Sequence, residues 1–188
     1  SIFLPDTVTA IGQSAFTHCT ALTSVRFPAA LSSIGQEAFL GCTRLSGVDL
    51  PDSVNSIGSG AFWNCTRLSY FRYPRSWTTA GTSIFHNCSS LASVTIPEGV
   101  ASIPAYAFFQ APALRSVSLP SSLTAIGSSA FLGCSQLESV SLPEAVTSVG
   151  NSAFSGCTNL RYVLVGNPTL RFNTSVFSSC PSVQLGCN

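Results

Sequence analysis

A phenylalanine recurs every 23 residues along the chain, with no insertion or deletion between recurrences. The eight positions are Phe16, Phe39, Phe62, Phe85, Phe108, Phe131, Phe154 and Phe177. A strict repeat of this length is typical of solenoids, in which each unit buries its apolar side only against its neighbours. The sequence therefore predicts about eight stacked coils that form one elongated body.

Each coil ends in a short alternating segment that is typical of a strand. In the clearest copy, Val140 and Leu142 point to one side and the serines beside them point to the other. Pro143 follows at once and ends the pairing, because proline has no N–H to donate. One such strand in each coil, stacked in parallel, predicts a sheet along the solenoid.

The rest of each coil reads Val-x-x-Ile-Gly-x-x-Ala-Phe and covers the other side of the core. Its three- and four-residue spacings fit a short 3₁₀ or helical turn, and they fit an irregular second strand equally well. The position before the cysteine column is occupied mainly by Gly and Asn, which indicates a positive φ angle. In the fourth coil Trp77 replaces Val and Ala80 replaces Ile, so a gain in volume offsets a loss nearby.

The last coil, residues 166–188, departs from the repeat and is predicted to be a degenerate coil or a cap. Its segment Val183-Gln184-Leu185 predicts only a poor strand. The first residues match the tail of a repeat, and no initiator Met precedes them. We therefore interpret residues 1–188 as a single solenoid fragment, whose lack of a targeting segment says nothing about compartment.

Charge is scarce in this chain. Only 8% of the residues are charged, against about 25% in ordinary soluble proteins, and the net charge is +1. The chain therefore lacks the excess of positive charge that binding to nucleic acid or to anionic membrane surfaces needs. No apolar run reaches the roughly 18 residues of a membrane span, so we expect no direct insertion into a membrane.

Seven of the eight cysteines share one column: Cys19, Cys42, Cys65, Cys88, Cys134, Cys157 and Cys180. Stacked coils bring them close enough for a disulfide ladder, and a column of free, buried thiols is the alternative. A straight row does not form the tetrahedron that zinc prefers, so we predict no metal site. Cys187 lies off the column and could form a disulfide with Cys180.

No catalytic constellation emerges from the repeat. His18 and His86 fall three coils apart, about 14 Å at strand spacing, and the acids form no close pair. Nucleophilic catalysis needs a base beside the nucleophile and a third group that orients it. We therefore predict that the protein is not an enzyme and needs no cofactor.

The outward-facing columns of the predicted sheet are the best place for recognition. Arg26, Asp49 and Arg72 fall in one column of adjacent strands, and Tyr70 lies beside them. The three charges form either a cross-strand ion-pair ladder or, with Tyr70, a protein-binding patch. Tyr162 occupies the same column as Tyr70 and is a further candidate for protein binding.

Two other patterns concern the surface. Asn64, Asn87 and Asn173 each begin an Asn-x-Ser/Thr sequon and are possible glycosylation sites, although Asn64 and Asn87 also fit a purely conformational role. A column of small, mostly hydroxyl residues resembles the faces of ice-binding solenoids, which gives ice- or crystal-surface binding as an alternative function; ordinary polar filling is the other explanation of the column. That column contains Thr9, Ser32, Asn55, Thr78, Ala101, Thr124 and Thr147.

The repeat Leu-Pro-x-x-Val-x-x-Ile-Gly-x-x-Ala-Phe-x-x-Cys-x-x-Leu-x-x-Val-x-Leu resembles the BspA-like, or Treponema-type, leucine-rich repeat over essentially the whole chain. The resemblance implies a right-handed solenoid with its parallel sheet on the concave face. It also implies a secreted or cell-surface module that binds a protein or glycoprotein. A structural solenoid that self-associates through its ends, or lines a cell coat or filament, is the alternative function.

Overall fold

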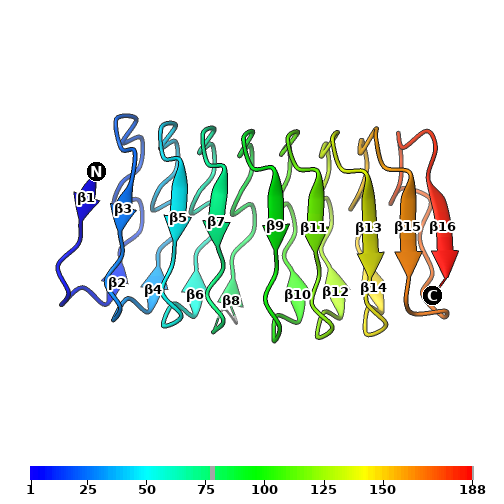
Figure 1. Cartoon of the computed structure of the whole chain (residues 1–188), viewed down its shortest axis with the longest axis horizontal. Coiled ribbons are helices and arrows are strands. Elements are labelled where there is room, and N and C mark those ends of the chain that lie inside the picture. The colour runs from blue at the N-terminus through cyan, green and yellow to red at the C-terminus, as the bar shows by residue number, and fades with distance from the viewer. Residues whose placement is uncertain (77–78, 188) are drawn as a thin grey trace.

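The repeat winds into a solenoid of about eight coils, which lie side by side in chain order (Figure 1). This computed structural model describes residues 1–76 and 79–187, and within those ranges every regular element is a strand and none is a helix. That part of the chain accordingly has no helix long and apolar enough to cross a bilayer. The predicted solenoid of 23-residue coils is confirmed.

Nine strands of two to four residues form one side of the solenoid, here called the strand face (Figure 1). They are β1 (Ile2–Phe3), β3 (Val25–Arg26), β5 (Gly47–Asp49), β7 (Tyr70–Arg72), β9 (Ser93–Thr95), β11 (Ser116–Ser118), β13 (Ser139–Leu142), β15 (Tyr162–Val165) and β16 (Gln184–Cys187). Burial alternates along them as predicted. In β13, Val140 and Leu142 are buried and the two serines are exposed.

The ladder on the strand face is interrupted, where a single sheet was expected. Regular pairing joins β1 with β3, β5 with β7, β9 with β11, and β13 with β15 and β16. Between some of these groups a single backbone bond remains, such as the one from the Ser46 N–H to the Thr23 carbonyl at 3.3 Å. Strands this short make few hydrogen bonds, so side-chain packing carries much of the stacking.

A second set of two-residue strands follows the proline column, so an irregular second strand is the alternative that the coil adopts. These strands are β2 (Ala10–Ile11), β4 (Ser33–Ile34), β6 (Ser56–Ile57), β8 (Thr79–Ala80), β10 (Ser102–Ile103), β12 (Ala125–Ile126) and β14 (Ser148–Val149). They form two parallel ladders, β2-β4-β6-β8 and β10-β12-β14. The break between β8 and β10 falls at the same coil junction as the break between β7 and β9, where Figure 1 shows a wider spacing.

Glycine follows the Ile column because the backbones of neighbouring coils meet there. A Cβ atom on Gly35 would lie 2.6 Å from the Gln13 nitrogen, and one on Gly127 would lie 2.4 Å from the Ala105 nitrogen. Pro104 occupies this column directly after β10, and no ladder in the described residues joins β10 to β8. A side chain at this position holds two backbones apart, which accounts for the missing ladder.

The turn around each Phe is also bonded to the next coil. The N–H groups of Ser129, Phe131 and Gly133 each donate to a carbonyl in the following coil, at 2.8–2.9 Å. Positive φ angles at Ser129 (55°) and Gly133 (78°) place these donors on the same side of the chain. The column before the cysteines therefore has positive φ as predicted, whereas the serine-rich column two residues before each Phe was not foreseen.

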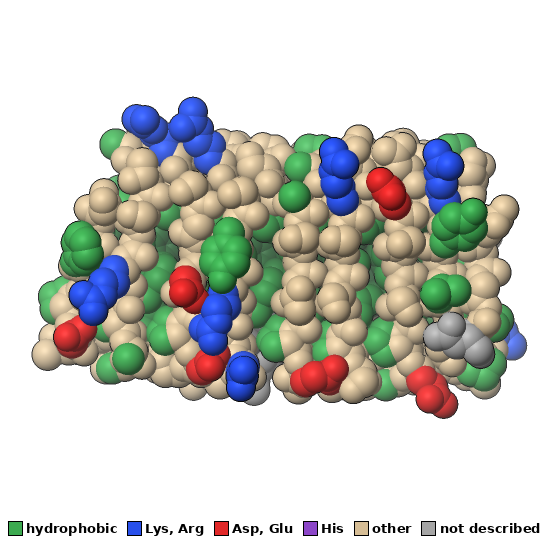
Figure 2. Space-filling model, in the orientation of Figure 1, with side chains coloured by type: hydrophobic (Ala, Val, Ile, Leu, Met, Phe, Trp, Pro, Cys, Tyr) green, Lys and Arg blue, Asp and Glu red, His purple; other side chains and the backbone are tan. Residues whose placement is uncertain are grey.

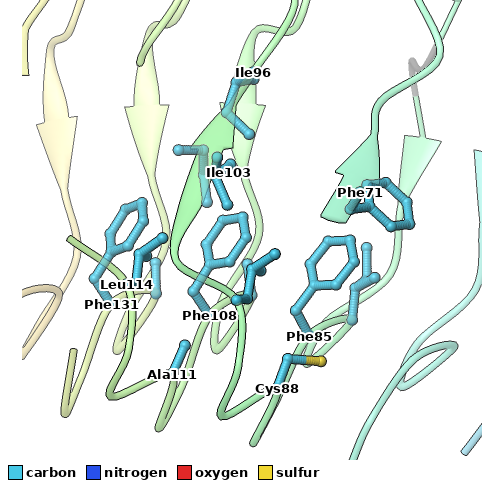
Figure 3. Close-up of a cluster of buried hydrophobic side chains, with 14 of the residues drawn as sticks. Phe71, Phe85, Cys88, Ile96, Ile103, Phe108, Ala111, Leu114 and Phe131 are labelled. Carbon is cyan, nitrogen blue, oxygen red and sulfur yellow. The ribbon is translucent and has the colours of Figure 1, made fainter. Parts of the chain in front are cut away.

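The Phe column forms a continuous stack of rings through the core. Neighbouring ring centroids lie 5.1–5.9 Å apart, and the ring planes differ by 1–14°. The six rings from Phe39 to Phe154 are buried. Figure 3 shows Phe85, Phe108 and Phe131 in this row, with Phe71 of β7 against Phe85 at a centroid distance of 4.5 Å.

The cysteine column lies beside the rings, and all eight cysteines of the chain are free. Six of the thiols lie 3.0–3.3 Å from the carbonyl oxygen of the Phe 26 residues earlier, to which they donate. Burial raises the pKa of Cys42 to about 11 and that of Cys134 to about 12. Of the two alternatives for the column, the structure has free thiols.

The possible disulfide between Cys180 and Cys187 is not formed in this structure. The Cys180 thiol donates to the Phe154 carbonyl at 3.0 Å, while Cys187 is exposed at the end of β16. The last coil nevertheless continues the fold, because β16 pairs with β15 over four residues. The prediction of a poor strand there was wrong, and the coil is one residue shorter, with Gln184 opposite Tyr162.

The volume exchange predicted at Trp77 and Ala80 rests on side chains outside the described residues.

Replacing Phe131 by Ala should lower the free energy of unfolding by about 3–5 kcal/mol, because the buried ring contacts a ring on each side. Denaturant unfolding followed by circular dichroism measures this change. The control Ser141→Ala alters an exposed side chain in β13 and should change stability by less than about 0.5 kcal/mol. A loss below about 1 kcal/mol for Phe131→Ala would contradict the ring stack.

Iodoacetamide should modify Cys187 rapidly in the folded protein and leave Cys65, Cys88 and Cys134 unmodified, because the thiolate is the reactive form and burial raises their pKa values. Mass spectrometry of peptides after timed labelling separates these sites. In guanidinium chloride all of them should react, and Cys187→Ser should remove the fast phase. Rapid labelling of Cys134 under native conditions would show that the column is open.

Candidate functional site

The predicted patch lies on β3, β5 and β7, and the last two of these strands pair in register. Gly47 is opposite Tyr70, and Asp49 is opposite Arg72. The Tyr70 ring lies beside Gly47, where a Cβ atom would be 3.7 Å from the tyrosine Cδ1. Tyr70 is 55% exposed although it contacts the sheet on one side. The patch therefore combines an outward aromatic ring with a charged pair one step further along the strands.

Arg72 is held by three acceptors from the preceding coil. Its guanidinium donates to the Leu50 carbonyl at 2.7 Å, contacts Asp52 at 3.2 Å, and lies 3.6 Å from Asp49. The backbone N–H of Arg75 also donates to Asp52, and this bond, followed by the charge of Arg72, lowers the pKa of the Asp52 carboxyl. Asp52 was missed from the sequence. Its place directly after the proline column, one coil before Arg72, is the signal that could have found it.

The ion-pair ladder, one of the two alternatives for Arg26, Asp49 and Arg72, is therefore only partly formed. Among the described residues the only salt bridges join Arg72 to Asp49 and to Asp52, and Arg26 takes no part. Arg26 is exposed in β3 and lines a hollow of about 340 Å³ with Asp6 and Asp49. The patch thus has a fixed centre at Arg72 and an unpaired arginine at its flank.

Tyr162 belongs to a separate spot on the same face. It lies in β15, four coils from Tyr70, or about 19 Å at the usual strand spacing. It is 56% exposed and lines a second hollow, of about 360 Å³, with Arg161 and Gln184. The five residues predicted to bind protein therefore share one face but form two groups.

In the hydroxyl column on the surface, hydroxyl groups form hydrogen bonds between neighbouring coils. Ser32 Oγ donates to the Thr9 carbonyl, and Thr124 Oγ1 donates to the Ala101 carbonyl, both at 2.9 Å. These bonds join consecutive coils and account for small hydroxyl residues at these positions. Thr78 of the same column lies outside the described residues.

The three sequon asparagines also bond to neighbouring coils. Asn64 and Asn87 have φ angles of 60° and 57°, and Asn87 Nδ2 donates to Asn64 Oδ1 at 2.8 Å. Asn173 is exposed, and its Nδ2 donates to Asn151 Oδ1 of the preceding coil at 2.7 Å. A conformational reason therefore exists for Asn64 and Asn87, while glycosylation of all three stays a prediction.

A mostly apolar row that the sequence reasoning missed lies on the turn side of the coils, one residue after each Phe from Phe39 to Phe131. Its centre is His86, whose ring stacks on Trp63 at 4.7 Å and lies 4.6 Å from Phe109. Leu40 and Leu132 extend the same column in the neighbouring coils. No group of three or more His, Cys, Asp or Glu in the described part of the chain could hold a metal ion.

Burial between the two rings lowers the pKa of His86 below its ordinary 6.5. Because the folded protein then binds the proton less well than the unfolded chain, stability should fall as the pH drops below about 6.5. NMR titration of the ring protons should give a pKa below 6.5, and Phe109→Ala should raise it by exposing the ring. A value at or above 6.5 in the unmodified protein would contradict the stacked arrangement.

Comparison with solved structures finds the same fold in bacterial proteins. A leucine-rich repeat protein from Bacteroides ovatus superposes with a TM-score of 0.88 and is 33% identical over 98% of this chain, which spans only 48% of that protein. The T. pallidum leucine-rich repeat protein superposes with a TM-score of 0.79 at 36% sequence identity, and the match covers 84% of this chain and 76% of that protein. A leucine-rich cell surface protein from Faecalibacterium prausnitzii superposes with a TM-score of 0.79 at 34% sequence identity. The match covers 93% of this chain and 49% of that protein.

A search of the curated proteins finds no match. The family comparison matches the BspA type leucine rich repeat region, with six copies, over residues 1–108 and 69–184. These ranges contain the ring stack, the thiol column and both groups of candidate residues on the strand face. The chain belongs to the BspA-type leucine-rich repeat family.

Proposed function

We propose that this chain is a non-enzymatic recognition module, which binds a protein or glycoprotein partner through its strand face at the cell surface or outside the cell. The observation that carries the proposal is the pair of Tyr70 and Arg72 on β7. In β9, β11 and β13 the outward residues are serines and one threonine, so these large side chains stand out from a plain surface. Tyr and Arg are the residue types that most often dominate binding energy at protein interfaces.

The geometry of the pair supports a binding role because Arg72 is held before a partner arrives and the Tyr70 ring lies against the sheet. Arg72 is fixed by Leu50, Asp52 and Asp49. The Tyr70 ring rests beside Gly47, which has no side chain to displace it. Side chains that are already ordered lose less entropy on association, which favours affinity.

The family gives coarser support. Leucine-rich repeat solenoids generally mediate protein interactions, and one similar protein is described as a leucine-rich cell surface protein. This chain spans about half the length of that protein and of the Bacteroides ovatus protein. The partner, the surface location and any adhesive role are therefore our proposals for this chain.

Two competing functions were raised by the sequence. Ice binding through the hydroxyl column is not favoured, because Ser32 and Thr124 use their hydroxyls to bond the preceding coil. Self-association through the terminal coils, or assembly into a cell coat or filament, stays a prediction. Light scattering at rising protein concentration tests it.

Tyr70→Ala combined with Arg72→Ala should weaken binding to a protein partner at least tenfold, about 1.4 kcal/mol, because it removes both large side chains. Biolayer interferometry against a panel of matrix and plasma proteins measures the affinity. The control Tyr106→Ala removes an exposed tyrosine from the turn side and should change affinity less than twofold. A partner that binds the double variant and the unmodified protein equally would exclude this patch.

A further inference from the structure

The few charges on the strand face are sorted by sign between its two edges, as the blue and red side chains in Figure 2 show. Residues that precede the strands form the amino-terminal edge, and residues that follow them form the carboxyl-terminal edge. The amino-terminal edge contains Arg44, Arg67, Arg115, Arg161 and one acid, Glu138. The carboxyl-terminal edge contains Asp6, Asp52, Glu98, Glu144 and one base, Arg75.

The two edges also differ in how their charges are used. On the carboxyl-terminal edge, Asp52 binds Arg72, and Glu98 accepts hydrogen bonds from the backbone and hydroxyl of Ser121 at 3.0 Å. The four arginines of the amino-terminal edge are all exposed. None of them makes a salt bridge with any described residue. The positive edge is therefore free to bind, whereas part of the negative edge already serves the fold.

The arginines are spaced along the solenoid axis. Arg44 and Arg67 lie on consecutive coils, and Arg115 and Arg161 are two coils apart. From Arg44 to Arg161 the row covers five coils, or about 24 Å at the usual strand spacing. An extended polypeptide of roughly seven residues covers that length, at about 3.3 Å a residue. Tyr70 and Tyr162 lie on the strand face beside this row, each in a strand that follows one of its arginines.

We infer that the partner presents an acidic, extended polypeptide segment, which lies along the amino-terminal edge of the strand face. This inference rests on the proposed function and adds the chemistry of the ligand. Guanidinium groups bind carboxylates through two parallel hydrogen bonds, and the two tyrosines suit contact with a peptide. The two edges are separated by six extended residues, or about 20 Å. A broad polyanion such as a nucleic-acid duplex would therefore also contact the acids of the opposite edge.

The probe is a fluorescein-labelled octa-glutamate peptide, whose binding is followed by fluorescence anisotropy. Arg44→Gln with Arg67→Gln should weaken binding at least fivefold. The matched control, Arg75→Gln with Arg171→Gln, removes the same charge away from this edge and should change binding less than twofold. Glu138→Gln should tighten binding at least twofold, a gain that misfolding would not produce. Raising the salt from about 0.1 M to about 1 M should abolish binding, because the Debye length falls from about 10 Å to about 3 Å.

Three results would overturn the inference. They are no binding of octa-glutamate, equal losses in the two double variants, and binding of a sulfated heparin octasaccharide more tightly than octa-glutamate. A captured protein partner separates this inference from the proposed function. If Tyr70→Ala weakens binding of that partner and the changes at Arg44 and Arg67 do not, the recognition function stands and the acidic ligand is rejected.

Discussion

The stack of phenylalanine rings through the core is the interaction on which the rest of the structure depends. No single coil encloses an apolar interior, so each ring is buried only when the rings before and after it are in place. The thiol column and the backbone bonds from each turn to the next coil follow the same 23-residue step. This shared step holds every outward side chain in a fixed column, which is how a chain with few charges brings them together.

The strand face can carry a binding surface, as proposed, because the core leaves its outward columns unconstrained. Positions such as Ser116, Ser118 and Ser141 have no role in packing, so a change there costs little stability. Tyr70 and Arg72 occupy the same kind of position, and neither is required by the ring stack. Under the proposed function, the side chains that occupy these outward columns therefore determine which partner binds. Arg72 is in addition supported by contacts with the preceding coil.

The fold could be predicted from the sequence because its signals repeat eight times, and each copy of the Phe column confirms the others. Single features were harder to predict. The contact between Arg72 and Asp52 joins two columns that are distinct in the repeat, and the stack of Trp63 on His86 depends on a column with no consensus. Serine at positions such as Ser129 carries no signal for a positive φ angle. The interrupted ladders also escaped prediction, because they depend on how close two backbones come.

The missing ladders between β7 and β9 and between β8 and β10 have a mechanical consequence. At that one junction both strand layers are open in the described residues, yet the N–H groups of Ser83, Phe85 and Asn87 still bond the turn of the next coil. In the described residues, the backbone hydrogen bonds between the two halves of the solenoid therefore lie along the turn edge. Bending about that edge disturbs the fewest of them and changes the angle between the halves that carry Tyr70 and Tyr162.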